Sequence, residues 1–107
     1  MTAIIKILKP TGMLDGATTN ELRNQVMDLI QQGADIVLLE MENVTFMNSS
    51  GIGALVAILK MVRAREKQLY LCGLSDQVNM IFKLTKMDRV FKPFIDRVEF
   101  ETKIVTA

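Results

Sequence analysis

Histidine is absent from the 107 residues, and cysteine occurs once, as Cys72. Without histidine the chain lacks the commonest general base, the Ser-His-Asp triad and most catalytic zinc sites. A single cysteine cannot form an intrachain disulfide. Cys72 lies within an apolar segment, so the sequence favours a small core residue over a reactive thiol. These absences predict a protein that is not an enzyme and that carries no metal or cofactor.

Excess charge and long apolar runs are also missing. The net charge is +1, so the overall field favours neither nucleic acid nor an anionic membrane as a partner. No apolar run approaches the ~20 residues that span a bilayer, and residues 1–9 lack the layout of a signal peptide. Lys60, Arg63 and Lys67 share one face of a predicted helix, where cations complement the dipole of the helix C-terminus. We therefore expect a cytoplasmic protein.

Half of the residues are hydrophobic, which is enough for one domain, residues 1–107, to bury a core. Apolar runs at residues 4–8, 36–39 and 69–74 predict strands. The run 36–39 shows no alternation, which is typical of a strand buried on both faces of a parallel sheet. A last short strand is predicted at residues 98–100.

Apolar residues at helical spacing predict helices between these strands. We expect the first helix to begin at Thr18, which forms a capping box with Glu21, and to end at Gly33. The next helix extends to about Lys67, and Ser75 caps the one after it. The alternation predicts an α/β domain with a mixed, mostly parallel sheet of about four or five strands and about four helices packed on it.

The segment Asn48-Ser49-Ser50-Gly51-Ile52-Gly53 joins a strand-like run to a helix-like run. With Asn48 as the N-cap, the hydroxyls of Ser49 and Ser50 lie near the positive end of the helix dipole. A phosphate on Ser49 would add about −1.5 to −2 charge at a helix N-terminus, which receives phosphate well. Phosphorylation there would turn a neutral surface patch anionic without unfolding the domain.

Gly51 and Gly53 each cost roughly 0.8–1 kcal/mol relative to alanine in a helix. Two of them in a first turn indicate that something approaches closely, namely a kinase, a bound partner or the domain's own neighbouring strand. The same residues also suit a plain cap and turn, and the pattern alone favours that interpretation by about two to one. A phosphate-binding loop is excluded, because no lysine precedes Lys60 at the required spacing.

The remaining polar and sulfur-containing residues carry weaker signals. Asp15 is isolated in the sequence, while Glu99 and Glu101 are expected on one face of an edge strand, so none of the three is assigned a catalytic role. Met13 and Met47, both next to predicted turns, are the methionines best placed for an adaptable contact surface.

Three segments resemble the STAS domain, and more narrowly the stand-alone bacterial anti-sigma factor antagonists. They are Thr11-Gly12-Met13-Leu14-Asp15, the strand Ile36–Leu39, and Phe46-Met47-Asn48-Ser49-Ser50-Gly51-Ile52-Gly53. The similarity covers nearly the whole chain in the same order of elements. The last segment is similar to the family motif Phe-Met-Asp-Ser-Ser-Gly-Leu-Gly, which is specific enough to reverse the odds in favour of a switch.

The resemblance implies a function and a set of site residues. Ser49 matches the serine that a kinase-type anti-sigma factor phosphorylates. The unphosphorylated form would bind that anti-sigma factor and release a sigma factor, and a PP2C-type phosphatase would restore binding. No direct contact with nucleic acid or a membrane is implied. The residues expected to contact partners are Asp15, Asn48, Ser50, Gly51, Ile52 and Gly53.

The chain departs from the family pattern in two places. Asn48 replaces the usual aspartate, which keeps the cap but removes a negative charge beside the hydroxyl of Ser49. A strand that usually precedes the one at Ile4 is expected to be shortened or lost. Two other functions remain open: an accessory or scaffold subunit of a transporter or stress-signalling assembly, and a small nucleotide-binding or hydrolytic protein.

Overall fold

A computed structural model describes residues 3–106. Its strands are β1 (Ile5–Leu8), β2 (Gly12–Leu14), β3 (Ile36–Glu40), β4 (Val44–Met47) and β5 (Gln68–Cys72). Its helices are α1 (Gly16–Gln31), α2 (Ser49–Ala64), α3 (Asp76–Thr85), α4 (Met87–Phe91), α5 (Arg97–Phe100) and the π-helical turn η1 (Glu101–Val105). The predicted α/β class is confirmed, and every pairing among the described strands is parallel.

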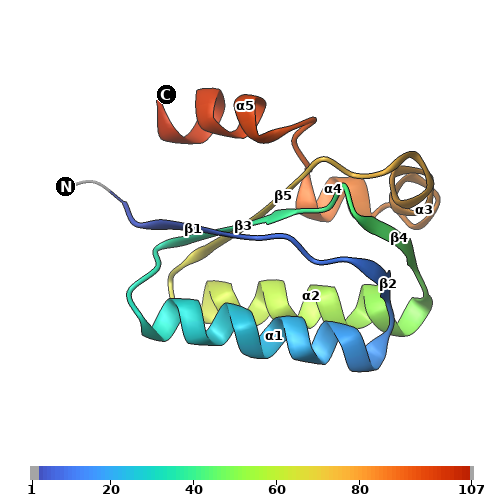
Figure 1. The fold of residues 1–107 in the computed structure, drawn as a ribbon, viewed down its shortest axis with the longest axis horizontal. Helices are drawn as coiled ribbons and strands as arrows, with labels where there is room; N and C mark the ends of the chain where they lie inside the picture. The colour runs from blue at the N-terminus through green and yellow to red at the C-terminus, as the bar shows by residue number, and fades with distance from the viewer. Residues whose placement is uncertain (1–2, 107) are drawn as a thin grey trace.

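The central sheet has the strand order β1-β3-β5. Helices α1 and α2 lie side by side on one face, and α5 with η1 lies on the other (Figure 1). Every residue of β3 is buried, because this strand has a neighbour on each edge and helices over each face. The prediction of a doubly covered parallel strand at 36–39 is therefore confirmed.

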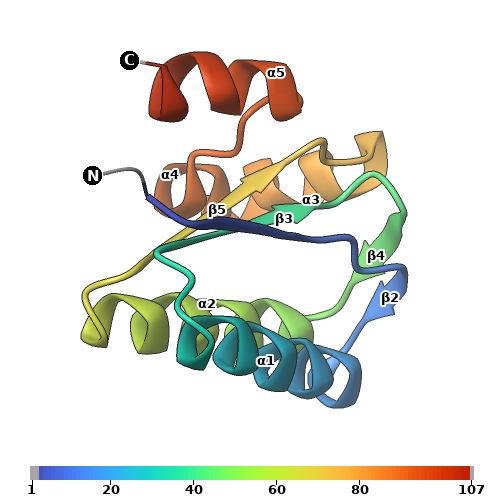
Figure 2. The same cartoon turned by 60° about the vertical axis from the view of Figure 1, so that its left-hand side comes forward.

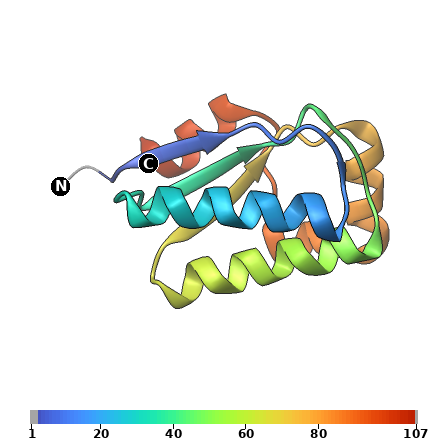
Figure 3. The same cartoon turned by 60° about the horizontal axis from the view of Figure 1, so that its bottom comes forward.

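The second sheet is the pair β2-β4, which extends from the first sheet at one end of the molecule (Figure 3). Leu14 stands opposite Met47 in this pair, and both side chains are buried. Each strand then leads directly into a helix, β2 into α1 and β4 into α2. The two helices consequently begin at the same end of the domain.

Two apolar clusters hold the layers together. The larger one fills the space between the sheet and α1 and α2, and Leu55 at its centre is fully buried. Truncating such a leucine to alanine costs about 2–5 kcal/mol. The smaller cluster lies on the opposite face, where Tyr70, Phe94 and Phe100 pack with ring centroids 5.5 to 5.8 Å apart.

The sequence predicted that the first helix begins at Thr18, and this prediction was wrong. The N-cap is Asp15, whose side chain accepts from the N–H of Thr18, while the Thr18 hydroxyl accepts from the N–H of Asp15. Thr18 is thus the third helical residue of the capping box rather than its first member. Gly33 does follow the helix end, with a φ of +106° that suits glycine.

The strand predicted at residues 98–100 was also wrong. Asp96 caps a short helix by accepting from the N–H of Glu99, and η1 continues it. Phe100 packs beneath Tyr70, so burial of one aromatic ring outweighs the strand preference of a three-residue run. Glu99 and Glu101 are therefore helical residues and do not share the face of a strand.

Within residues 3–106, none of the helices is long and apolar enough to cross a membrane. Before β1, the described chain contains Ala3 and Ile4 outside any strand. The expectation of a lost strand before Ile4 depends partly on Met1 and Thr2, which lie outside the described residues.

Candidate functional site

Two helix N-termini meet where β2 and β4 end. Since Leu14 and Met47 are register partners, the residues that follow them, Asp15 and Asn48, stand at equivalent positions and cap α1 and α2 respectively. The N–H of Asn48 lies 3.4 Å from the carbonyl oxygen of Leu14. A Cβ on Gly16 would lie 3.6 Å from the Cβ of Ser50, so the first turns of the helices are in contact.

The cap on α2 leaves two amides available. Asn48 is extended, and its side-chain oxygen accepts from the N–H of Gly51 at 2.8 Å, as the sequence predicts. The N–H of Ile52 donates to the carbonyl of Asn48 at 3.0 Å. The N–H groups of Ser49 and Ser50 have no protein partner within residues 3–106. An oxyanion at Ser49 would find those donors beside the positive end of the helix.

The two glycines have different surroundings. A Cβ on Gly51 would lie 2.0 Å from the carbonyl oxygen of Leu14, so the close approach predicted for this residue comes from the domain's own strand β2. A Cβ on Gly53 would meet nothing within 4 Å. Gly51 is therefore required by the packing of α2 on β2, whereas Gly53 leaves an open place on the surface of the helix.

The carboxylate of Asp15 is held by the first turn of α1. The N–H and hydroxyl of Thr18 donate to it at 2.9 and 3.0 Å, and these bonds lower the pKa of Asp15 below its ordinary value. The resulting site contains one carboxylate at the start of α1 and neutral residues at the start of α2. Ile52 is half-buried and packs against the main core.

An exposed apolar pair lies on the two strands that lead into α1 and α2. Met13 and Phe46 are register partners in β2 and β4, with 43% and 40% of their surfaces exposed. Met47, expected on this surface, is 1% exposed and belongs to the core, so that expectation was wrong. Phe46 was missed because the sequence does not show which strand residue faces inward; the pairing with β2 decides it.

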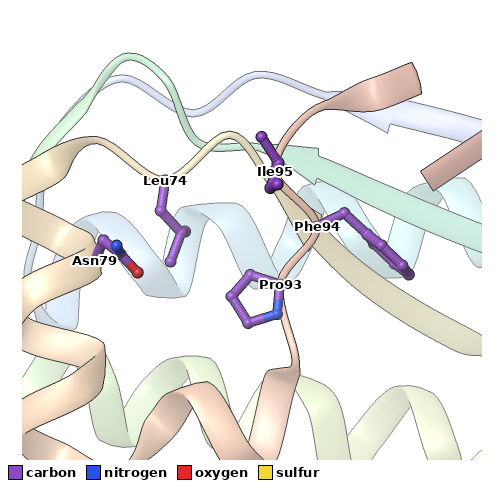
Figure 4. Close-up of a pocket in the computed structure, with 5 residues that line it drawn as sticks. All are labelled: Leu74, Asn79, Pro93, Phe94 and Ile95. Carbon is purple, nitrogen blue, oxygen red and sulfur yellow. The ribbon is translucent and has the colours of Figure 1, made fainter. Parts of the chain in front are cut away.

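Within residues 3–106, the hollow in Figure 4 and the acidic and cysteine side chains form no metal-binding or catalytic cluster. The hollow in Figure 4, about 180 Å³, is lined by Leu74, Asn79, Pro93, Phe94 and Ile95. The ring of Phe94 points away from Asn79 in this view. Neither a carboxylate nor a nucleophile lines this hollow, and within residues 3–106 no cluster of acidic or cysteine side chains is arranged to bind a metal. Cys72 is buried, and burial raises the pKa of its thiol to about 11.

Comparison with known proteins identifies relatives of the same architecture. The STAS domain family model matches residues 2–101. An anti-sigma-B factor antagonist of Staphylococcus aureus (strain NCTC 8325 / PS 47) is 35% identical over 78 residues, which cover 73% of this chain and 72% of that protein.

Two solved structures show the same fold. A candidate anti-sigma factor antagonist from Thermotoga maritima superposes with a TM-score of 0.81 at 23% identity, covering 94% of this chain and 86% of that one. The Bacillus cell fate determinant SpoIIAA in its phosphorylated form gives 0.66 at 18% identity, with 100% and 95% covered. The relatives are regulatory proteins, and the chain is not an enzyme. Since the family model spans nearly all of its length, the chain belongs to the STAS domain family.

Proposed function

We propose that this protein is an anti-sigma factor antagonist whose binding is switched by phosphorylation of Ser49. In the unphosphorylated form it binds a kinase-type anti-sigma factor, and that complex releases a sigma factor. The kinase activity of the anti-sigma factor then phosphorylates Ser49 and ends binding. A PP2C-type phosphatase removes the phosphate and returns the protein to its binding form.

The observation that carries this proposal is the exposed first turn of α2. Ser49 is its first residue and is exposed, and its amide and that of Ser50 have no protein partner within residues 3–106. A phosphate on Ser49 therefore gains hydrogen-bond donors at a helix N-terminus, so the folded domain tolerates it. The name and 35% identity of the Staphylococcus aureus relative support the anti-sigma factor as the partner.

Exposed apolar side chains on the strands that lead into α1 and α2 support binding of a folded partner. Met13 and Phe46 supply adjacent exposed apolar side chains, and Gly53 leaves an open place on α2. A partner packed on this surface would bury the hydroxyl of Ser49. A dianionic phosphate in the same place would have to be buried without a counter-charge, which is strongly unfavourable.

Binding of the cognate anti-sigma factor to Ser49 variants tests the switch. We expect Ser49→Ala to bind as the wild type does, and Ser49→Asp to bind at least about 30-fold more weakly, since burying an unpaired carboxylate costs about 2 kcal/mol or more. Calorimetric titration measures the affinity, and circular dichroism verifies that both variants are folded. Undiminished binding by Ser49→Asp would contradict the switch.

Ser50→Ala is the matched control for the site of modification. Incubation with the anti-sigma factor and ATP, followed by mass spectrometry, should add one phosphate to the wild type and to Ser50→Ala, but none to Ser49→Ala. Both serines are exposed, and Ser50 also lies against Gly16 of the neighbouring helix. Phosphate found on Ser50 would show that the wrong hydroxyl has been assigned.

A further inference from the structure

The outer edge of β1 is an open side of the central sheet. The strand order β1-β3-β5 places β1 at the margin, and among residues 3–106 it pairs with β3 alone. In Figure 1, β1 passes in front of the other strands of this sheet, between α5 above and α1 below, and none of the described elements passes in front of it. Figure 2, turned by 60°, shows the same arrangement. Lys6 is exposed, Ile7 is 37% exposed and Ile5 is half-buried, so solvent reaches this edge.

The backbone groups at this edge can be assigned from the pairing of β1 with β3. The N–H of Ile36 donates to the carbonyl of Ile4, so the backbone groups of Ile4 face inward. In a parallel ladder, the groups of successive residues point to opposite sides, and those of Ile5 and Ile7 therefore face outward. Within residues 3–106 no backbone partner meets these outward groups. Ile5 and Ile7 each offer one N–H and one C=O to an added strand.

The side chains of β1 divide between the two faces of the sheet. Ile5 and Ile7 point to the face covered by α5, where they line a hollow of about 260 Å³ beside Phe100 and Val105. Lys6 lies between the two isoleucines and therefore points to the opposite face. An added strand would place its own side chains in the same alternation. Two apolar side chains would lie next to Ile5 and Ile7 and the hollow, and the residue between them would lie next to Lys6.

The charge of Lys6 decides which strand fits this edge. None of the salt bridges among the described residues involves Lys6. On an antiparallel strand, the Cβ of the residue opposite Lys6 lies about 5 Å away, where an opposite charge stabilises the pair and a like charge destabilises it. A second copy of this chain, paired with Ile5 opposite Ile7, would bring two Lys6 side chains together. The edge therefore disfavours pairing with itself and favours a strand with an acidic residue at this position.

We propose that the outer edge of β1, defined by Ile5, Lys6 and Ile7, binds an extended segment of a partner protein in which an acidic residue is flanked by apolar ones. The segment adds to the three-stranded sheet as an antiparallel strand, because directly opposed residues then exchange both backbone hydrogen bonds. Its backbone bonds to Ile5 and Ile7, its apolar side chains extend the hollow beside Phe100, and its carboxylate pairs with Lys6. None of these residues belongs to the proposed phosphorylation switch.

The test titrates the ¹⁵N-labelled protein with the capped peptide Thr-Val-Glu-Val-Thr. We expect the amide signals of Ile5 and Ile7 to shift as the peptide is added. The same peptide with both valine amides N-methylated should bind at least about 10-fold more weakly, because methylation removes the backbone hydrogen bonds and leaves the charge and the side chains. Equal binding of the methylated peptide would overturn the added strand.

A charge exchange tests the acidic position. The peptide Thr-Val-Lys-Val-Thr should bind the wild type at least about 3-fold more weakly than the glutamate peptide, and Lys6→Glu should reverse this preference. Lys83→Glu, an equal charge change at an exposed position of α3, should leave the preference unchanged. If Lys6→Glu kept the wild-type preference, the pairing with Lys6 would be refuted. Shifts of the Ile5 and Ile7 signals with rising protein concentration in the absence of peptide would identify a second copy as the occupant and overturn the proposal.

Failure of this proposal is distinguishable from failure of the phosphorylation switch. Ser49→Asp should bind the glutamate peptide like the wild type, and Lys6→Glu should still bind the anti-sigma factor.

Discussion

Gly51 and Gly53 lie two residues apart in α2, yet the same substitution should change stability in opposite directions. In a helix, alanine is favoured over glycine by about 0.8–1 kcal/mol. Because a Cβ on Gly53 meets nothing within 4 Å, Gly53→Ala should gain most of this amount. We expect its melting temperature to rise by about 4 °C, on the scale of a domain of this size.

At Gly51 the gain in helix propensity is outweighed by a collision. The added Cβ would lie 2.0 Å from the carbonyl oxygen of Leu14 and 2.8 Å from its carbonyl carbon. Both are backbone atoms, so a side-chain rotation cannot relieve the overlap. The start of α2 must move away from β2 by more than about 1 Å, and overpacking of this kind costs about 1–3 kcal/mol.

The collision moves backbone, so its cost lies at the upper end of that range. After the gain in propensity, Gly51→Ala should lose about 2 kcal/mol of unfolding free energy and melt about 8–12 °C lower. Urea unfolding of wild type, Gly51→Ala and Gly53→Ala at one temperature measures the difference directly. If Gly51→Ala were as stable as the wild type, the close packing of α2 on β2 would be refuted.

Three further predictions concern groups outside the glycine pair. Asn48→Ala should lower the unfolding free energy by about 1 kcal/mol by leaving the N–H of Gly51 without its cap, while Asn48→Asp should not; thermal melts compare the two. Cys72 should react with a thiol reagent at pH 8 only through transient opening, since a pKa of about 11 leaves about one thiolate in a thousand; addition of urea should accelerate labelling. Arg97 donates to the buried carboxylate of Glu40 and holds the pKa of Glu40 below its ordinary value of 4.5. That stabilisation is complete above pH 4.5 and is lost as pH falls through the lowered pKa, so the difference in melting temperature between wild type and Arg97→Ala should narrow in acid.

Features with a local cause were predictable from the sequence. The uniform apolar run of β3 indicates burial on both faces, and this strand was predicted correctly. The caps Asn48 and Ser75 were also found, because the cap residue, the helix it begins and the amide it binds are all within four positions.

Features with a distant cause were not predictable. Asp15 and Thr18 are both good cap residues, and the local sequence does not decide between them. The choice is made by β2, which ends at Leu14 where its partner β4 ends at Met47. Phe46 is exposed in place of the predicted Met47 for the same reason, since strand pairing sets which side chain faces the core.

The C-terminal helix illustrates a stronger distant effect. Residues 98–100 have the composition of a strand, but they pair with no strand of the sheet. Phe94 already occupies the adjoining part of the β5 edge. Instead Phe100 reaches the ring cluster with Tyr70 and Phe94 when the segment is helical. A three-residue preference is small compared with the burial of an aromatic side chain, which is worth about 1.5–3 kcal/mol.

Some residues of the junction between β4 and α2 stabilise the fold, and others do not. Asn48 caps the helix, Gly51 admits the carbonyl of Leu14, and Ser50 packs beside the first turn of α1. The hydroxyl of Ser49 makes no hydrogen bond within residues 3–106, although those of Thr18 and Ser75 both do. Gly53 lowers helix stability without relieving any contact. An exposed hydroxyl at Ser49 and an open place at Gly53, neither used for the stability of the domain, are what the proposed phosphorylation switch requires.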